Sequence, residues 1–138
     1  MEDGDPPLPG EDVSEADWPA FIRRRKLERG HLLVVDLRHL TPRELEDRAG
    51  QCLTWFQRNH EIHEKVLVLA TGTTSDGRSQ SAMRRMAIPF QGRFECCAVA
   101  ELSEFQRMLV NSVNLFLAMP FKPFGTYTDA IKYLVEKS

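Results

Sequence analysis

The residue types best suited to chemistry are gathered in one loop between an apolar strand and a helix. The loop comprises Gly72, Thr73, Thr74, Ser75, Asp76, Gly77, Arg78 and Ser79. Hydroxyl groups in such a loop can accept phosphate from a kinase, and the free N–H groups of a helix N-terminus favour an anion. In open α/β sheets the functional crevice lies beyond the carboxyl ends of the strands. We therefore take this loop as the candidate phosphorylation or anion-binding site.

The same loop nearly matches the phosphate-binding P-loop of nucleotide hydrolases. Gly72, Gly77 and Ser79 have the spacing of that motif, and the loop lies between a strand and a helix as the motif requires. Arg78 replaces the lysine that reaches the terminal phosphates, and too little chain follows for a nucleotide-binding domain. The pattern therefore favours simple anion binding over nucleotide hydrolysis.

Three other groups of residues have types or spacings that could form a site. Asp36 ends a strand, where α/β enzymes often carry catalytic residues, but it can equally cap the turn or pair with Arg38. His60 and His63 have a spacing that could share a metal, but no third ligand is visible and a solvated helix end explains them. The adjacent cysteines at 96–97 point to opposite faces of a strand and suit packing. We expect no catalytic residue, metal or cofactor.

Alternating strands and helices must position the loop. Unbroken apolar runs predict strands covered on both faces, and a proline places the last strand at a sheet edge. The expected strands are residues 31–37, 65–71, 95–100 and 121–124. This α/β alternation predicts a parallel sheet in sequential order, with right-handed crossovers and helices mainly on one face.

Capping signals and apolar stripes predict the helices. Thr41, Pro42 and Glu44 form a strong helix start, and the stripe that follows extends to about residue 59. Further helices are expected around residues 83–87, at 103–116 and after Thr126, where Ala130, Ile131, Leu134 and Val135 face inward. An N-terminal helix is expected from about Glu15 to Arg29, with Trp18, Phe21 and Ile22 on its apolar face.

Composition limits the class of protein. The 138 residues, 42% of them apolar, suit one domain over residues 14–138, preceded by a disordered acidic tail at 1–13. The net charge of −2 argues against nucleic-acid binding, and the basic cluster at 23–26 reads as a solvated face. No run approaches the ~20 apolar residues of a membrane span. Three cysteines, an odd number, indicate free thiols in a reducing cytoplasm.

Several segments resemble the SpoIIAA-like branch of the STAS/SEC14 superfamily. They are VVDLRHLTPRELEDRA at 34–49, KVLVLATGT at 65–73, CCAVAELSEFQRMLVNSVNLF at 96–116 and FKPFGTYTDAIKYL at 121–134. The resemblance covers about residues 31–136 and implies a β-α superhelix. It also implies a non-enzymatic regulatory or protein-interaction module, like the anti-sigma-factor antagonists, or a carrier of a small lipid-like or anionic ligand.

In the antagonists a serine at the start of the helix after a central strand is phosphorylated. The matching positions are around Ser75 and Ser79, although Asp76 follows Ser75 here, whereas the antagonists place an Asp before their Ser. The long N-terminal helix also departs from the N-terminal strands of typical STAS domains. We expect it to pack across the face of the sheet that the crossover helices leave open, alone or with a second subunit. If one helix is too narrow to cover that face, the remainder of the face becomes a surface for another protein or for a second copy of the chain.

Overall fold

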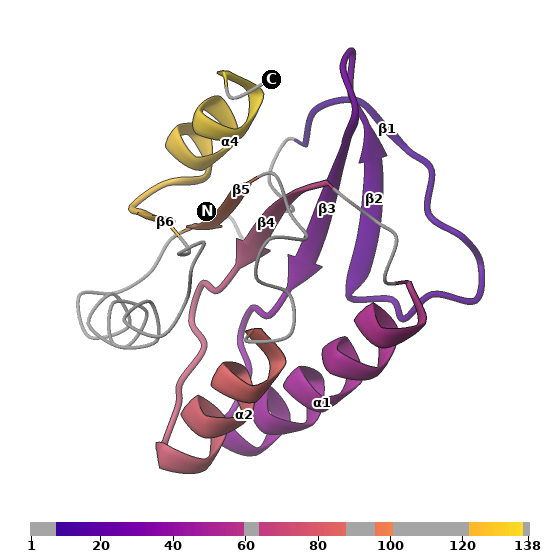
Figure 1. Ribbon diagram of the computed structural model, residues 1–138. Coiled ribbons are helices and arrows are strands. Elements are labelled where there is room, and N and C mark those ends of the chain that lie inside the picture. The colour runs from indigo at the N-terminus through magenta and orange to yellow at the C-terminus, as the bar shows by residue number, and fades with distance from the viewer. Residues whose placement is uncertain (1–7, 60–63, 88–95, 101–121, 137–138) are drawn as a thin grey trace.

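The computed structural model describes residues 8–59, 64–87, 96–100 and 122–136, and within these ranges the chain forms one mixed sheet flanked by helices (Figure 1). The strands are β1 (Glu11–Asp12), β2 (Ile22–Lys26), β3 (His31–Asp36), β4 (Lys65–Leu69), β5 (Cys96–Ala100) and β6 (Lys122–Phe124). The helices are α1 (Pro42–Arg58), α2 (Gly77–Ala87) and α4 (Tyr127–Glu136). The helix expected at 103–116 lies outside the described residues. No described helix is long and apolar enough to cross a membrane.

The strands follow one another across the sheet in the order of the sequence. β3 through β6 are parallel, with Val35 opposite Val68 and Val68 opposite Val99. Each coincides with an expected strand to within two residues at either end. β1 and β2 add an antiparallel pair on the β3 side. Parallel strands share a carboxyl edge, so the loops after β3 and β4 lie together.

One face of the sheet is covered by α1 and α2, which pack side by side (Figure 1). The sheet contributes Leu33, Val35, Val66, Val68, Cys97 and Val99 to this core. Leu45, Ala49, Cys52 and Phe56 of α1 meet them, along with Ala82 and Met86 of α2. The cap predicted at Thr41 is present: its hydroxyl accepts a hydrogen bond from the Glu44 amide, and Glu44 accepts one from the Thr41 amide.

The opposite face is covered by α4, which corrects the expectation that the N-terminal segment lies there. Ala130 and Leu134 of α4 are fully buried, and they pack on alternate residues of the central strands. These strand residues are Leu32, Val34, Leu67, Leu69, Ala98 and Ala100. Leu8 and Leu27 add cover at the edge of this cluster. Val135, expected to face inward, is exposed. Described helices therefore lie on both faces of the sheet.

The predicted helix at 15–29 is wrong, because this segment forms a turn and strand β2. Pro19 lies inside the expected helix, where a proline removes a hydrogen bond and clashes with the preceding turn. In the structure the Pro19 carbonyl instead accepts a hydrogen bond from the Ile22 amide across a turn. Ile22 then enters the sheet opposite Val35 and is completely buried. Pairing with the free side of β3 outweighs the helical spacing of the apolar residues.

Two side chains fasten the segment before this turn onto β2. The Arg25 guanidinium donates hydrogen bonds to the carbonyls of Leu8 (3.4 Å), Pro9 (3.1 Å) and Gly10 (2.6 Å). The Ser14 hydroxyl accepts a hydrogen bond of 2.8 Å from the Arg24 amide. Residues 8–13 are therefore part of the sheet edge, within the segment expected to be a disordered tail.

Replacing Arg25 with alanine is expected to loosen residues 8–14 and leave the central sheet intact. Three hydrogen bonds from a charged donor are lost, and we expect a cost of about 1–2 kcal/mol because the site is partly exposed. Amide hydrogen exchange should show faster exchange at Val13, whose amide donates to the Arg24 carbonyl. Arg23→Ala on the same strand serves as control. Equal effects of the two variants would contradict the role given to Arg25.

Candidate functional site

The loops that follow β3 and β4 are joined by several backbone hydrogen bonds at the carboxyl edge of the sheet. The Leu37 amide donates to the Leu69 carbonyl and the His39 amide to the Thr71 carbonyl, each at 2.8 Å. Further along, the Thr74 amide donates to the Leu40 carbonyl at 3.0 Å. The pairing of the two strands thus continues beyond the sheet and fixes the candidate loop.

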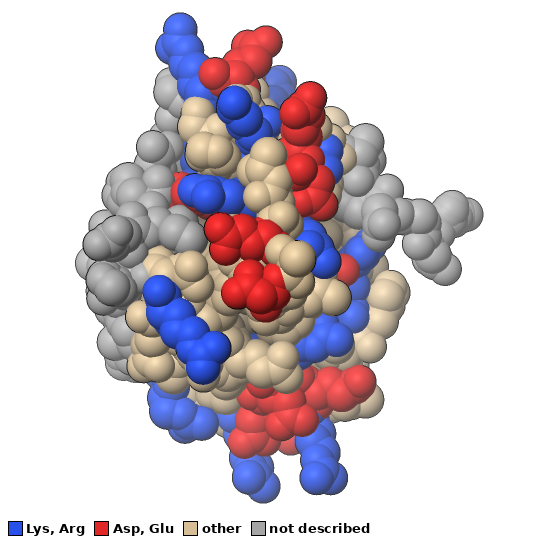
Figure 2. Space-filling model, turned by 90° about the vertical axis from the view of Figure 1, so that its right-hand side faces the viewer, with Lys and Arg blue, Asp and Glu red and all other residues tan. Residues whose placement is uncertain are grey.

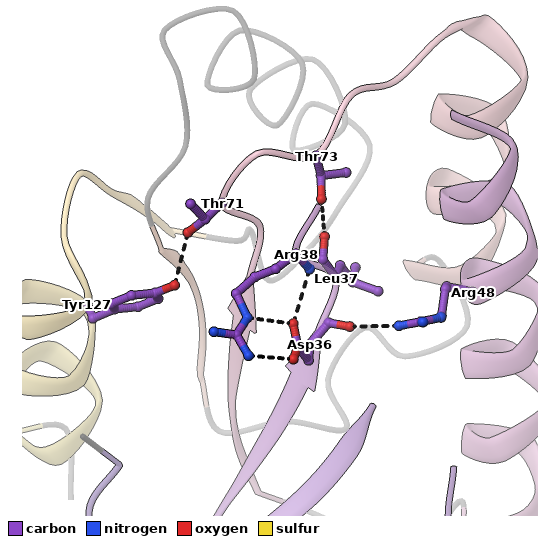
Figure 3. A network of polar contacts seen from close by, with 7 residues as sticks. All are labelled: Asp36, Leu37, Arg38, Arg48, Thr71, Thr73 and Tyr127. Carbon is purple, nitrogen blue, oxygen red and sulfur yellow. Dashed lines mark hydrogen bonds and ion pairs between the residues drawn. The ribbon is translucent and has the colours of Figure 1, made fainter. Parts of the chain in front are cut away.

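Thr73 joins the two loops through its buried hydroxyl. This hydroxyl donates to the Leu37 carbonyl (Figure 3). It also accepts a hydrogen bond of 3.2 Å from the Leu40 amide. Leu37 and Leu40 are both buried, so the Thr73 hydroxyl supplies a hydrogen-bond partner to two backbone groups that lie away from water. The loop was expected to present its Ser or Thr hydroxyls to a kinase, and Thr73 does not do so because it is buried.

Gly72 is favoured at its position by its backbone conformation and by the nearby His39 side chain. Its φ of +71° lies in the left-handed region, and a Cβ atom there would come within 2.5 Å of the His39 imidazole. His39 itself has a φ of 58°. The first glycine of the P-loop-like pattern thus serves the packing of one loop on the other.

Asp76 and Ser79 cap the N-terminus of α2 reciprocally. The Asp76 carboxylate accepts a hydrogen bond of 2.9 Å from the Ser79 amide, and the Ser79 hydroxyl accepts one of 2.8 Å from the Asp76 amide. The bond from the Ser79 amide is the main reason that the pKa of Asp76 is lowered. Ser79 is completely buried, so its predicted accessibility to a kinase is wrong. A carboxylate already occupies part of the position at which an anion was expected.

The remaining polar residues of the loop face outward to different degrees. Thr74 is exposed, and its hydroxyl lies 3.4 Å from the Leu40 carbonyl. Ser75 is half-buried, and its hydroxyl oxygen is covered. The Arg78 side chain is 84% exposed and lies 3.6 Å from Glu46 of α1. Thr74, Asp76 and Arg78 are thus the polar members of the predicted site that are exposed to a protein partner.

Asp36 at the end of β3 is held by two arginines. The Arg38 guanidinium makes two hydrogen bonds to its carboxylate, at 2.7 and 2.8 Å, and Arg48 of α1 donates to the Asp36 carbonyl at 3.3 Å (Figure 3). Burial acts to raise the pKa of Asp36, but the hydrogen bonds and charge of Arg38 outweigh it and hold the pKa below 3.8. Of the three roles considered for Asp36, the geometry supports two: its carboxylate accepts a hydrogen bond of 3.1 Å from the Arg38 amide, which caps the turn, and it pairs with the Arg38 guanidinium.

A contact that the sequence did not indicate ties the site to α4. The Thr71 hydroxyl and the Tyr127 hydroxyl lie 2.9 Å apart, although the residues are 56 positions apart in the chain (Figure 3). Only the order of strands in the sheet brings them together, so no local pattern could reveal the pair. The candidate site is consequently anchored to elements on both faces of the sheet.

Metal-binding and thiol chemistry gain no support from the described parts of the chain. Across residues 8–59, 64–87, 96–100 and 122–136, no three His, Cys, Asp or Glu residues are grouped so that they could hold a metal. His60 and His63 lie outside these ranges. Cys52 and Cys97 are buried, and burial raises the pKa of the Cys52 thiol to about 12.

Comparison with known proteins identifies the fold. The chain is similar to the crystal structure of an uncharacterized protein of the DUF3478 family from Shewanella loihica PV-4, which is described as having a SpoIIAA-like fold. The TM-score is 0.57 at 16% sequence identity, over 82% of this chain and 91% of the other. No protein-family model and no curated protein sequence matches the chain. The chain therefore has the SpoIIAA-like fold that its sequence segments resemble.

Replacing Thr73 with valine is expected to lower the free energy of unfolding by about 1–3 kcal/mol, because it leaves buried backbone groups of the β3 loop without these partners. Valine has nearly the same shape, so the loss reports the hydroxyl alone. The matched control is Thr74→Val on the exposed neighbour, for which we expect a change within about 0.5 kcal/mol. Denaturant unfolding measures both, and equal losses would contradict the bridging role of Thr73.

Replacing Asp36 with asparagine is expected to reduce stability at neutral pH and to change its dependence on acid. Because the folded state lowers the pKa of Asp36, the carboxylate stabilises the fold above its ordinary pKa of 3.8, and this contribution is lost as the pH falls through the folded value. The variant and the native chain should therefore differ most at neutral pH and converge in acid. Unfolding curves from neutral to acidic pH test this, with Asp47→Asn as control. A difference that stays constant with pH would contradict it.

Proposed function

We propose that this SpoIIAA-like chain is a non-enzymatic regulatory module that binds a protein partner, and that the loop after β4 controls the binding. The observation that carries the proposal is that most polar side chains at this edge of the sheet are already engaged in hydrogen bonds within the chain. The hydroxyls of Thr73 and Ser79 are bonded to the backbone, and Asp36 is paired with Arg38. These bonds favour a rigid recognition surface over an active site.

Thr74 is the residue at which a covalent switch fits best. It is exposed, it lies two residues before Asp76, which caps the N-terminus of α2, and Arg78 projects from the first turn of that helix. A phosphate at this position would add roughly −1.5 to −2 charge close to a helix N-terminus, where negative charge is favoured. Ser75 is the second candidate, because its covered hydroxyl becomes available if the loop opens.

The alternative of a carrier for a small lipid-like or anionic ligand has weaker support. The Asp76 carboxylate already accepts the Ser79 amide at the N-terminus of α2, which leaves less room for an external anion. A lipid carrier needs an enclosed apolar cavity of several hundred Å³. Mass spectrometry of the chain under native conditions would reveal a retained lipid and thereby favour the carrier.

The switch is tested by isolating tagged full-length chain from its own cells in native form and as Thr74→Glu and Thr74→Val variants. We expect a stoichiometric protein partner whose binding changes at least severalfold with Thr74→Glu and is unaffected by Thr74→Val, since only the former adds charge. A second copy of the chain counts as such a partner, and sedimentation distinguishes it. Phosphopeptide analysis should find modification at Thr74 or Ser75. Identical partners for all three forms, together with unmodified loop peptides, would refute the switch.

A further inference from the structure

A groove lies away from the candidate loop, between residues 15–19 and the outward side of α1. Its volume is about 650 Å³ and it is open to solvent. Trp18 and Trp55 line it, and their rings meet edge to face with centroids 4.9 Å apart. Figure 2 shows the side of the molecule that lies at the right of Figure 1, where acidic side chains lie at the centre and at the lower end with Lys and Arg side chains around them. The groove thus combines an aromatic floor with a charged rim.

The floor contains a hydrogen-bond donor that lacks an acceptor. Trp55 is only 6% exposed, and no described residue accepts a hydrogen bond from its indole N–H. Leaving a buried donor unpaired carries a free-energy cost. The indole nitrogen is covered in the unbound chain, so a carbonyl oxygen of an occupant would reach it only once the groove residues over it move aside. A peptide backbone carries such an oxygen at every residue.

Gly50 leaves the middle of the groove open at a cost to α1. Glycine in the middle of a helix is less stable than alanine. Packing does not require it here, because a Cβ atom at this position would have no other atom within 4 Å. The absence of a side chain is explained if another chain lies directly over this turn of the helix.

The rim selects the charge of the occupant. Glu15, Asp17 and Asp47 line the groove, and Arg58 is the one basic residue among its lining residues. Carboxylates attract Lys and Arg side chains, and the tryptophan rings favour the same cations. The same carboxylates repel phosphate headgroups and acidic peptides.

We propose that this groove binds an extended peptide segment of a partner protein that carries Lys and Arg side chains. The proposal rests on the function proposed above, since it supplies a docking surface for that partner. It assigns peptide carbonyls to the Trp55 indole, basic side chains to Glu15, Asp17 and Asp47, and the close approach of the backbone to Gly50.

The test uses the intrinsic fluorescence of the full chain, whose two tryptophans are both in the groove. The probe is a capped octapeptide that alternates Arg or Lys with Ala, and the comparison peptide carries Glu at the basic positions. We expect a saturable change of emission with the basic peptide alone. Asp17→Lys combined with Asp47→Lys should weaken binding roughly tenfold or more, since two favourable contacts become repulsive. The matched control reverses Glu28 and Glu136, which are exposed elsewhere.

Substitutions of Gly50 separate binding from folding. Gly50→Ala should raise the midpoint of thermal unfolding, and Gly50→Gln should abolish peptide binding with an unchanged circular dichroism spectrum. No response to the basic peptide, an equal response to the acidic one, or a response only to vesicles of anionic phospholipid would each overturn the proposal. If the peptide fails to bind while partner binding still depends on Thr74, the groove assignment is wrong and the proposed switch stands.

Discussion

The central strands of this protein are apolar on both faces, and the rest of the architecture follows from the need to cover them. Leu32 to Val35 in β3 and Val66 to Leu69 in β4 are all buried. Apolar surface left in water is unfavourable by roughly 25 cal/mol per Å². The chain satisfies both faces with described helices, α1 and α2 on one and α4 on the other. These helices also hold the loops that form the candidate site, through Arg48 from one face and Tyr127 from the other.

Local patterns were sufficient for the elements whose signals lie within a few residues. The apolar run at 65–69 indicates a strand buried on both faces, and the residues Thr41 to Glu44 carry the cap of α1 in full. The prediction of a helix at 15–29 was wrong because the spacing of its apolar residues suits a helix. The segment instead pairs with β3, and that pairing is determined by the tertiary fold. Pro19 was the available local sign against a helix. The cover of the second face was misassigned for the same reason, since nothing in the sequence of α4 says which face it meets.

The place of the candidate loop in the fold was predicted from the sequence, but the hydrogen bonds within the loop were not. Its position after an apolar strand and before a capped helix follows from the sequence. The burial of Thr73 depends on residues of another loop, 33 to 36 positions earlier in the chain. The reciprocal hydrogen bonds between Asp76 and Ser79 could have been predicted from the sequence, because these two residues have the same spacing as Thr41 and Glu44 in the cap of α1. Their consequence, that Ser79 is committed to the helix, makes this loop more rigid than its composition of Gly, Ser and Thr indicates.

The two outer strands of the described sheet have a consequence for how the molecule behaves in concentrated solution. The outer strand of a sheet exposes unpaired N–H and C=O groups, on which another chain can add a strand and begin a fibril. β1 contains only Glu11 and Asp12, both exposed and negatively charged, and β6 contains three residues including Pro123, which has no N–H to donate. Short, charged or proline-bearing outer strands are poor templates for such growth. A second chain is therefore directed to the side-chain surfaces of the molecule, and continuous sheets between molecules are disfavoured.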